Sequence, residues 1–197
     1  MIIGEIVINI ELKVSVVDFT ETIHRLKKNG AIFKTLLSQI DTYYKCQNRR
    51  LKIREIDHKI YQLITYCRQD QAESKISDYT VKSLDKKELG RYKLRLSRVN
   101  GLRVKVSKKR ELWIYKNTRI HLDKVRGLGK FIELETVVKN TRDLQQFEKE
   151  HQGVVDLLDL SCFTKISTSY SDLLLEKKNQ DKILASHLIQ QSKPFSI

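Results

Sequence analysis

The stretch TRIHLDKVRGLGKFIELE, residues 118–135, decides the fold of this chain. Its first part alternates charged with apolar residues: Arg119, His121 and Asp123 share one parity, and Ile120 and Leu122 share the other. A turn with two glycines follows, and the alternation resumes with two glutamates in FIELETVV, residues 131–138. Because successive side chains of a strand point to opposite faces, both segments are predicted strands with one apolar and one charged face.

The same pattern occurs on both sides of this stretch. It predicts strands at residues 8–14, 39–45, 49–56, 59–68, 75–81 and 101–115, which makes about eight strands in all. Helical spacing predicts a helix over 18–29 that ends at Gly30, and another over 85–99 that begins at the capping residue Asp85. A third helix is expected to be capped by Asn140 or Thr141. We expect a domain over 1–175, followed by a polar helical or frayed tail over 176–197.

Charged strand faces have two explanations. In a sandwich the charged face of each strand is exposed to water, and for any single strand this explanation is as good as the other. Here the charged faces recur on most strands and mix both signs. A closed eight-stranded antiparallel β-barrel with a wet, charged interior and helices packed outside explains the whole set, so we expect a β-rich α+β fold of that kind.

The composition limits the function. The 197 residues include 38 Lys or Arg and 24 Asp or Glu, which gives a formal net charge of +14. Such an excess indicates a polyanionic partner: nucleic acid, an anionic membrane or a phosphate-rich small molecule. No run approaches the roughly 18 apolar residues of a spanning helix, and the three cysteines are too scattered for a disulfide framework or a zinc site. We therefore expect a cytoplasmic protein without membrane association.

The acidic residues of the strands suggest a metal site. Carboxylates at alternate positions of a strand point the same way, so Glu133 and Glu135 could together hold Mg²⁺ or Mn²⁺. Glu11 and Asp123 complete the candidate acidic set. A pair of glutamates at this spacing is by itself weak evidence for a metal site. The alternative is that the two carboxylates lie on a strand face that is exposed to water.

Basic residues occupy the corresponding positions of the other strands. Several cations that face one another repel unless an anion lies between them, so we expect a bound triphosphate to hold them together. A stripe that binds nucleic acid is the alternative, although exposed aromatic residues for base stacking are not prominent among these cations. The candidate set is Lys13, Lys52, Arg54, Arg68, Lys75, Lys108, Arg110 and Arg119.

Absent motifs exclude several enzyme classes. GxxxxGK[ST], GxGxxG and GxSxG do not occur, which excludes P-loop, dinucleotide-binding and hydrolase-elbow chemistry. The five histidines lack zinc-ligand spacing, and only His121 lies among charged positions. We expect a structural or substrate-orienting role for His121.

Taken in order, these motifs resemble the CYTH superfamily, also called triphosphate tunnel metalloenzymes, and within it the class IV adenylyl cyclase branch. The resemblance covers residues 1 to about 175 and rests on NIELK, QIDTYY, RLKIRE, YCRQD with KISDY, VSKKREL, TRIHLDKVRGLGKFIELE and SYSDLLL. It implies an eight-stranded tunnel that binds a triphosphate with basic residues on one side and a divalent cation with carboxylates on the other.

The resemblance also implies roles for single residues. Tyr170, Ser171 and Asp172 would close one end of the site. The first position of the family motif ExExK is Asn9 here, which offers an oxygen ligand without charge and predicts weaker metal binding. The implied metal ligands are Glu11, Asp123, Glu133 and Glu135, the implied catalytic residues are Glu11, Lys13, Arg54, Glu133 and Glu135, and the implied substrate-binding residues are the basic set with Tyr170 and Ser171.

From this resemblance we expect a phosphohydrolase, dependent on Mg²⁺ or Mn²⁺, that acts on tripolyphosphate, thiamine triphosphate or a nucleoside triphosphate. One alternative is a class IV adenylyl cyclase that converts ATP to cyclic AMP and pyrophosphate. Another is a non-catalytic protein that binds polyphosphate or an RNA 5′-triphosphate end, which Asn9 makes credible. We expect no other nucleic-acid partner, and the resemblance suggests a homodimer.

Overall fold

One antiparallel sheet of eight strands forms the body of the protein, in the order β1-β8-β7-β6-β2-β3-β4-β5. The computed structural model describes residues 8–47, 49–66, 79–139 and 141–191. The strands are β1 (Ile8–Val16), β2 (Ile32–Tyr44), β3 (Arg50–Ile56), β4 (Ile60–Tyr66), β5 (Tyr79–Leu84), β6 (Leu102–Tyr115), β7 (Thr118–Val125) and β8 (Gly129–Val138). The helices are α1 (Thr20–Lys28), α2 (Lys86–Val99), α3 (Leu144–Leu157) and α4 (Tyr170–Gln191).

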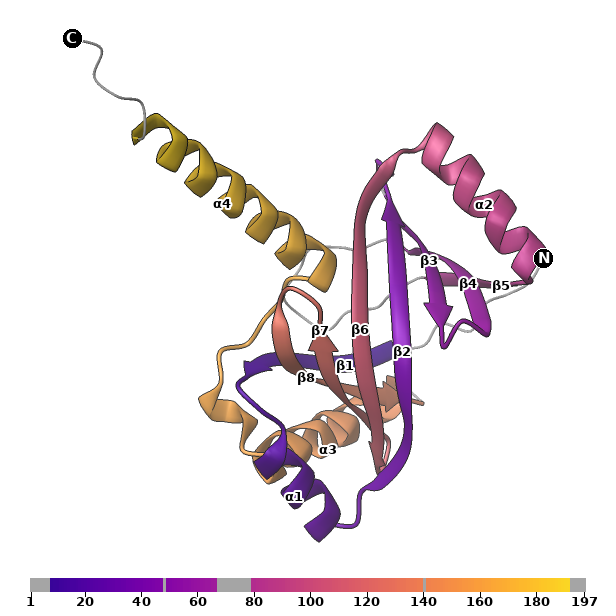
Figure 1. The fold of residues 1–197 in the computed structure, drawn as a ribbon. Helices are drawn as coiled ribbons and strands as arrows, with labels where there is room; N and C mark the ends of the chain where they lie inside the picture. Colours follow the sequence, from indigo (N-terminus) through magenta and orange to yellow (C-terminus); the bar gives the residue numbers. More distant parts are fainter. Residues whose placement is uncertain (1–7, 48, 67–78, 140, 192–197) are drawn as a thin grey trace.

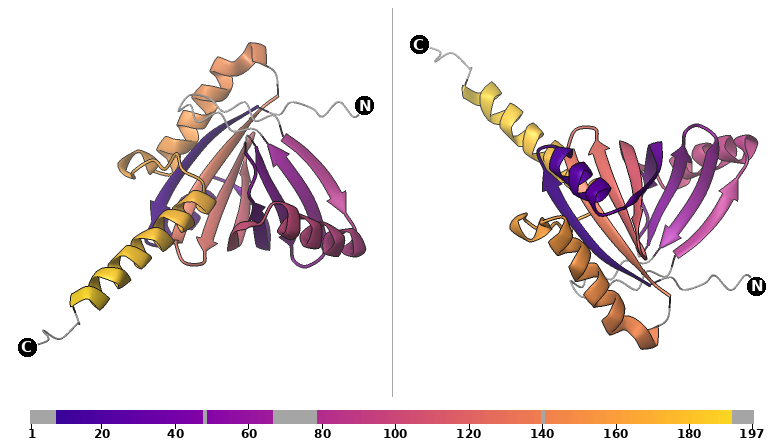
Figure 2. Two further views of the ribbon diagram at one scale, coloured as in Figure 1. Left: turned by 90° about the horizontal axis from the view of Figure 1, so that it is seen from above. Right: turned by 90° about the horizontal axis from the view of Figure 1, so that it is seen from below.

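The eight antiparallel strands confirm the predicted sheet, but its predicted closure into a barrel is not observed. Within the described ranges β1 and β5 are the two edges of the sheet, and they do not pair with each other. Figures 1 and 2 show a strongly curved sheet with these strands at its two ends. Alternation along a strand predicts which face a residue occupies, but not whether two edge strands come within the roughly 4.8 Å that pairing needs.

Helices α1, α2 and α3 lie outside the curved sheet (Figure 1), and buried apolar side chains pack them against the strands. A buried cluster joins β1, β6, β7 and β8 to α1 and α3, and it includes Leu26, Ile120 and Leu134, each with no exposed surface. A second cluster packs Leu89 of α2 against Tyr44 and Ile53. These three helices therefore lie outside the sheet, as predicted, and the charged faces of the strands are left on the concave side.

Helix α4 is placed differently from the other helices. Its first turns pack in a cluster at the end of the sheet, where Tyr170 and Leu174 meet Tyr43, Val104 and Phe131. The rest of the helix projects away from the sheet (Figures 1 and 2). It runs without interruption through residue 175, the end of the domain expected from the sequence.

Local signals in the sequence explain some element boundaries and not others. Asp85 begins α2 with a capping box, as expected for a residue of this type before a helix. The predicted start of α3 is wrong, because a 3-10 turn over Thr141–Asp143 precedes the helix and places Asp143 at the N-cap. Strand β2 begins seven residues before the predicted 39–45, in a half whose exposed positions do not alternate clearly. Part of the predicted strand over 75–81 lies outside the described residues.

No helix in the described ranges is both long enough and apolar enough to cross a membrane.

A chain of buried hydrogen bonds connects α3 to the sheet. The hydroxyls of Thr118 and Thr136 lie 2.8 Å apart, and the Thr136 hydroxyl lies 2.8 Å from Nδ1 of His151. Burial lowers the pKa of His151, and the nearby charge of Lys165 lowers it further. The folded state therefore favours the neutral imidazole.

We predict that the free energy of unfolding decreases as the pH falls below about 6.5, the ordinary pKa of histidine. The unfolded chain takes up a proton there while folded His151 resists it, so acid favours unfolding. Urea unfolding at about pH 7 and about pH 5 measures the difference between the two free energies of unfolding. This difference should be smaller in His151→Gln than in the wild type. His24→Gln, at an exposed position of α1, should keep the wild-type difference. An equal difference in all three proteins would contradict the prediction.

Candidate functional site

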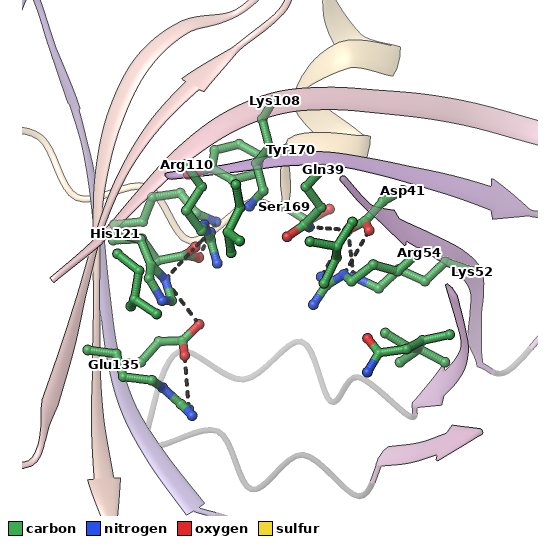
Figure 3. A pocket seen from close by; sticks show the side chains of 18 of the residues that line it. Gln39, Asp41, Lys52, Arg54, Lys108, Arg110, His121, Glu135, Ser169 and Tyr170 are labelled. Carbon is green, nitrogen blue, oxygen red and sulfur yellow. Dashed lines mark hydrogen bonds and ion pairs between the residues drawn. The ribbon is translucent and has the colours of Figure 1, made fainter. Parts of the chain in front are cut away.

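The concave side of the sheet contains a cavity of about 510 Å³. All eight strands and the residues at the start of α4 contribute side chains to its walls (Figure 3). Because side chains of one parity share a face, the charged positions of separate strands converge here. The cationic lining residues are Lys13, Lys52, Arg54, Lys108, Arg110 and Arg119, and the acidic lining residues are Glu11, Asp41, Glu133 and Glu135.

The cavity thus brings together most of the residues singled out in the sequence. Two of the predicted basic residues, Arg68 and Lys75, lie outside the described residues. Tyr170 lines the cavity. Asp123 and Ser171 are buried beside the lining residues, with 0% and 1% of their surface exposed, and neither contributes to the wall.

Glu11, Glu133, Glu135 and His121, which we term the acidic wall, meet through the pairing of β1, β8 and β7. The strand register places Glu11 opposite Glu135 and His121 opposite Glu133. Single ligand atoms of His121, Glu133 and Glu135 all lie within 4.8 Å of one another. Carboxylates on directly opposed positions repel, and a cation between them removes this repulsion. Oxygen and imidazole nitrogen are also ligands that divalent metal ions accept, so the acidic wall fits a metal ion.

Cations of the cavity lie beside Glu133 and Glu135. Arg110 lies 2.6 Å from Glu133 and Arg119 lies 3.0 Å from Glu135, while the ammonium of Lys13 is 3.6 Å from Glu133. Burial alone would raise the pKa of Glu133, but its interactions with His121, Arg110 and Lys13 keep it well below its usual value. Glu133 is therefore ionised at neutral pH.

Lys52, Arg54 and Asp41, which we term the basic wall, lie on β2 and β3 across the cavity. Asp41 accepts hydrogen bonds from Lys52 at 2.9 Å and from Arg54 at 2.8 and 3.0 Å. Gln39 donates a further one at 3.2 Å. Burial would raise the pKa of Asp41, but the two cations lower it below its usual value. Figure 3 shows this group of side chains apart from the group around His121 and Glu135.

Lys108 and Arg110 occupy β6 and share Asp123 as a partner. The Lys108 ammonium lies 2.9 Å from Asp123, and Arg110 donates two hydrogen bonds to it at 2.6 Å each. Burial, together with the adjacent Arg110, lowers the pKa of Lys108 to about 8. Lys108 therefore loses part of its charge just above neutral pH.

This pairing corrects an expectation from the sequence, which predicted mutually repelling cations that only a bound anion could hold together. Instead, every cationic lining residue has a carboxylate of the protein within 3.6 Å. Asp41 in particular was not recognised as a site residue, although it shares strand parity with Gln39 in the motif QIDTYY. The cavity supplies its own counter-ions.

Ser169 and Tyr170, at the start of α4, line the cavity, whereas Ser171 and Asp172 do not. Arg50 on β3 donates to Asp172 at 2.6 Å and to Ser169 at 2.5 Å, which fixes the first turn of the helix. The ring of Tyr170 then lies 4.7 Å from the ammonium of Lys13 and 5.0 Å from that of Lys108. Ser169, which lines the cavity, was not predicted from the sequence.

Three buried side-chain polar atoms lack a hydrogen-bond partner within the described residues: Nε of Arg119, Nδ1 of His121 and the hydroxyl of Tyr170. All three residues line the cavity. Because each such atom costs about 1–3 kcal/mol when it stays unsatisfied, their shared location indicates a site for a polar ligand or an ion.

Known proteins resemble this chain over most of its length. The family model described as CYTH domain matches residues 7–170. A protein of Methanocaldococcus jannaschii, whose name assigns it provisionally to the adenylate cyclases, is 26% identical over 175 residues, which cover 84% of this chain and 98% of that protein.

Solved structures share the fold. A protein of Pyrococcus horikoshii OT3 superposes with a TM-score of 0.69 at 26% identity and covers 86% of this chain and 99% of its own. A Hippeastrum protein is described provisionally as an adenylyl cyclase with a dominant triphosphatase activity. It superposes with a TM-score of 0.63 at 12% identity, over 88% of this chain and 96% of its own. At 12% identity the likeness extends to the fold alone.

We predict that Asp41→Asn lowers the free energy of unfolding by about 3 kcal/mol, because it leaves Lys52 and Arg54 without their shared anion. Tripolyphosphate should then raise the melting temperature of Asp41→Asn more than that of the wild type, since the Asp41 carboxylate no longer competes with it for the two cations. Denaturant unfolding and thermal shift measure both effects. Asp181→Asn, at an exposed position of α4, serves as the control. Equal stability of Asp41→Asn and the control would contradict this role for Asp41.

Proposed function

Because the chain belongs to the CYTH domain family, we propose that it is a divalent-metal-dependent phosphohydrolase that cleaves a linear triphosphate held in the cavity. The observation that supports this best is the arrangement of charge, in which an acidic wall that fits a metal ion faces cations on β3 and β6. Tripolyphosphate, thiamine triphosphate and nucleoside triphosphates all carry the anionic chain that these cations could bind.

Lys52, Arg54, Lys108 and Arg110 would bind the phosphoryl oxygens, since guanidinium forks and ammonium groups are the side chains suited to them. These cations already have partners in the protein, so a free triphosphate would have to displace buried carboxylates. A triphosphate that arrives as its divalent-metal complex brings a positive charge for the carboxylates and negative charges for the cations. Glu133 and Glu135 could then exchange their arginines for the metal, and the arginines could turn to phosphoryl oxygens. We therefore propose that the metal complex is the true substrate.

Catalysis would rest on positioning and electrostatics. A divalent cation bound at the acidic wall supplies charge neutralisation at the phosphoryl oxygens and a lowered pKa of an attacking water. Arg54 would hold the triphosphate chain in line, and Lys13, beside Glu133, would stabilise charge that develops in the transition state. The residues to which we assign catalytic roles are Glu11, Lys13, Arg54, Glu133 and Glu135.

An adenylyl cyclase is the second candidate, favoured by the provisional name of the Methanocaldococcus jannaschii relative. The same site would bind ATP, and the ribose 3′-hydroxyl would replace water as the nucleophile and attack the α-phosphate. Incubation of the purified chain with tripolyphosphate or ATP and Mg²⁺ or Mn²⁺, followed by separation of products, tests both. We expect phosphate release. Cyclic AMP with pyrophosphate would select the cyclase, and tight binding without any product would select a non-catalytic polyphosphate or RNA 5′-triphosphate binder.

We predict that Glu133→Gln lowers turnover at least about 100-fold, because it removes a charged ligand from the acidic wall. Binding of tripolyphosphate without metal should persist or tighten, since Arg110 and Lys13 lose a competing carboxylate. Product assays and calorimetric titration with tripolyphosphate measure the two quantities. Glu148→Gln, at an exposed position of α3, is the matched control. Turnover equal to that of the control would exclude Glu133 from metal binding.

We predict that Asn9→Glu lowers the concentration of Mg²⁺ or Mn²⁺ needed for half-maximal activity. Asn9 lines the cavity on the same strand face as Glu11, and its side-chain oxygen accepts a hydrogen bond from Arg119 at 3.4 Å. A carboxylate here adds negative charge beside the acidic wall. Asn9→Gln lengthens the side chain without charge and should leave the metal requirement unchanged. If both variants behave alike, Asn9 does not influence the metal.

A further inference from the structure

His121 carries a buried nitrogen atom that the fold leaves without a hydrogen-bond partner. Its side chain is 6% exposed, and Nδ1 has no partner within the described residues. The nearest carboxylate oxygens lie 3.6 Å away on Glu135 and 3.8 Å away on Glu133. Both distances exceed those of hydrogen bonds, so an imidazole bonded to a carboxylate does not describe this contact. The nitrogen instead faces the two carboxylates across a short gap.

The sheet register determines this arrangement. His121 lies directly opposite Glu133 in the pairing of β7 with β8, and Glu135 follows two residues later on the same strand face. Ligand atoms of the three residues lie within 4.8 Å of one another. Ligands at about 2.1 Å from one metal ion are about 3.0 Å apart when they occupy adjacent positions, so small rotations of the two glutamates would complete the site.

An arginine contacts each of the two carboxylates beside this point. Arg119 lies 3.0 Å from Oε2 of Glu135, while Oε1 of the same carboxylate is the atom nearest to Nδ1 of His121. Arg110 lies 2.6 Å from Oε2 of Glu133, the oxygen that also faces Nδ1 of His121, so a bound metal would share or replace this contact. Such contacts around a ligand set its direction and tune its affinity for metal.

We propose that His121, Glu133 and Glu135 form one metal site of mixed nitrogen and oxygen ligands, which takes Mn²⁺ or another first-row transition ion in preference to Mg²⁺. Mg²⁺ prefers oxygen ligands alone, whereas an imidazole nitrogen suits the transition ions. Three protein ligands leave positions for water and for phosphoryl oxygens. The inference rests on the proposed function, because it names the metal preference of the site assigned there.

Mn²⁺ alone, added to the full chain without substrate, is the direct probe. Pulsed electron paramagnetic resonance should detect coupling of bound Mn²⁺ to a ¹⁴N nucleus, and competition with Mg²⁺ should show at least about tenfold tighter binding of Mn²⁺. His121→Gln should lose the nitrogen coupling and bind Mn²⁺ about 10- to 100-fold more weakly, with a smaller change for Mg²⁺. His24→Gln is the matched histidine control and should match the wild type.

Bound Mn²⁺ without nitrogen coupling in the wild type would overturn the inference, and so would the absence of Mn²⁺ binding or an unchanged ratio of Mn²⁺ to Mg²⁺ affinity in His121→Gln. Even if His121→Gln does not fold, the wild-type spectrum shows whether a nitrogen atom ligates the bound Mn²⁺. Product assays with tripolyphosphate separate this inference from the proposed function. Nitrogen coupling without hydrolysis would refute the function alone, and hydrolysis by a site without coupling would refute the histidine ligand alone.

Discussion

Pairing of buried charges between neighbouring strands is the interaction on which this structure depends. A sheet with a charged concave face can exclude water from it only if unlike charges meet, because an unpaired buried charge is costly. The register meets this condition by setting Asp41 opposite Arg54, Arg110 opposite Asp123 and Lys13 opposite Glu133. A slip of one residue in any of these pairings would turn the charges toward the helices and the apolar side chains into the cavity. The same register that stabilises the sheet therefore builds the site.

Alternation in the sequence was enough to predict the strands and their charged faces, and parity within each strand was enough to select the cations that line the cavity. It could not predict which charges meet, since Asp41 and Arg54 face each other only through the register of β2 on β3. For this reason Asp41 was overlooked and the cations were expected to repel one another. Closure of the sheet also depends on the distance between two edge strands, which no local pattern encodes. The carboxylates that face Nδ1 of His121 come from the adjacent strand, so the sequence around His121 does not indicate this cluster.

The cations and carboxylates of the cavity neutralise one another. The charge outside the cavity can therefore attract polyanions, while the cavity itself discriminates among them. Most of the 38 basic residues lie outside the cavity lining, where they create a long-range field that attracts any polyanion. Within the cavity, an anionic ligand can bind a cationic side chain only if the carboxylate that was paired with this side chain contacts another positive charge. A simple polyanion such as nucleic acid provides no such charge, whereas a metal–triphosphate complex provides both. The internal carboxylates thus oppose the nonspecific binding that a net charge of +14 would otherwise favour.

The proposed metal site would depart in two places from an all-carboxylate ligand set, at His121 in the acidic wall and at Asn9 beside it. As metal ligands, Asn9 and His121 would contribute no negative charge, so they would neutralise less of the charge of a divalent ion than carboxylates would. The ion is then attracted less strongly by the protein, which weakens its binding in the absence of substrate. It also keeps more of its positive charge for the phosphoryl oxygens and for a bound water, whose pKa falls as the charge on the metal rises. Weak metal binding and strong polarisation of the substrate are therefore compatible in this site, and a low affinity for metal alone is no measure of its catalytic capacity.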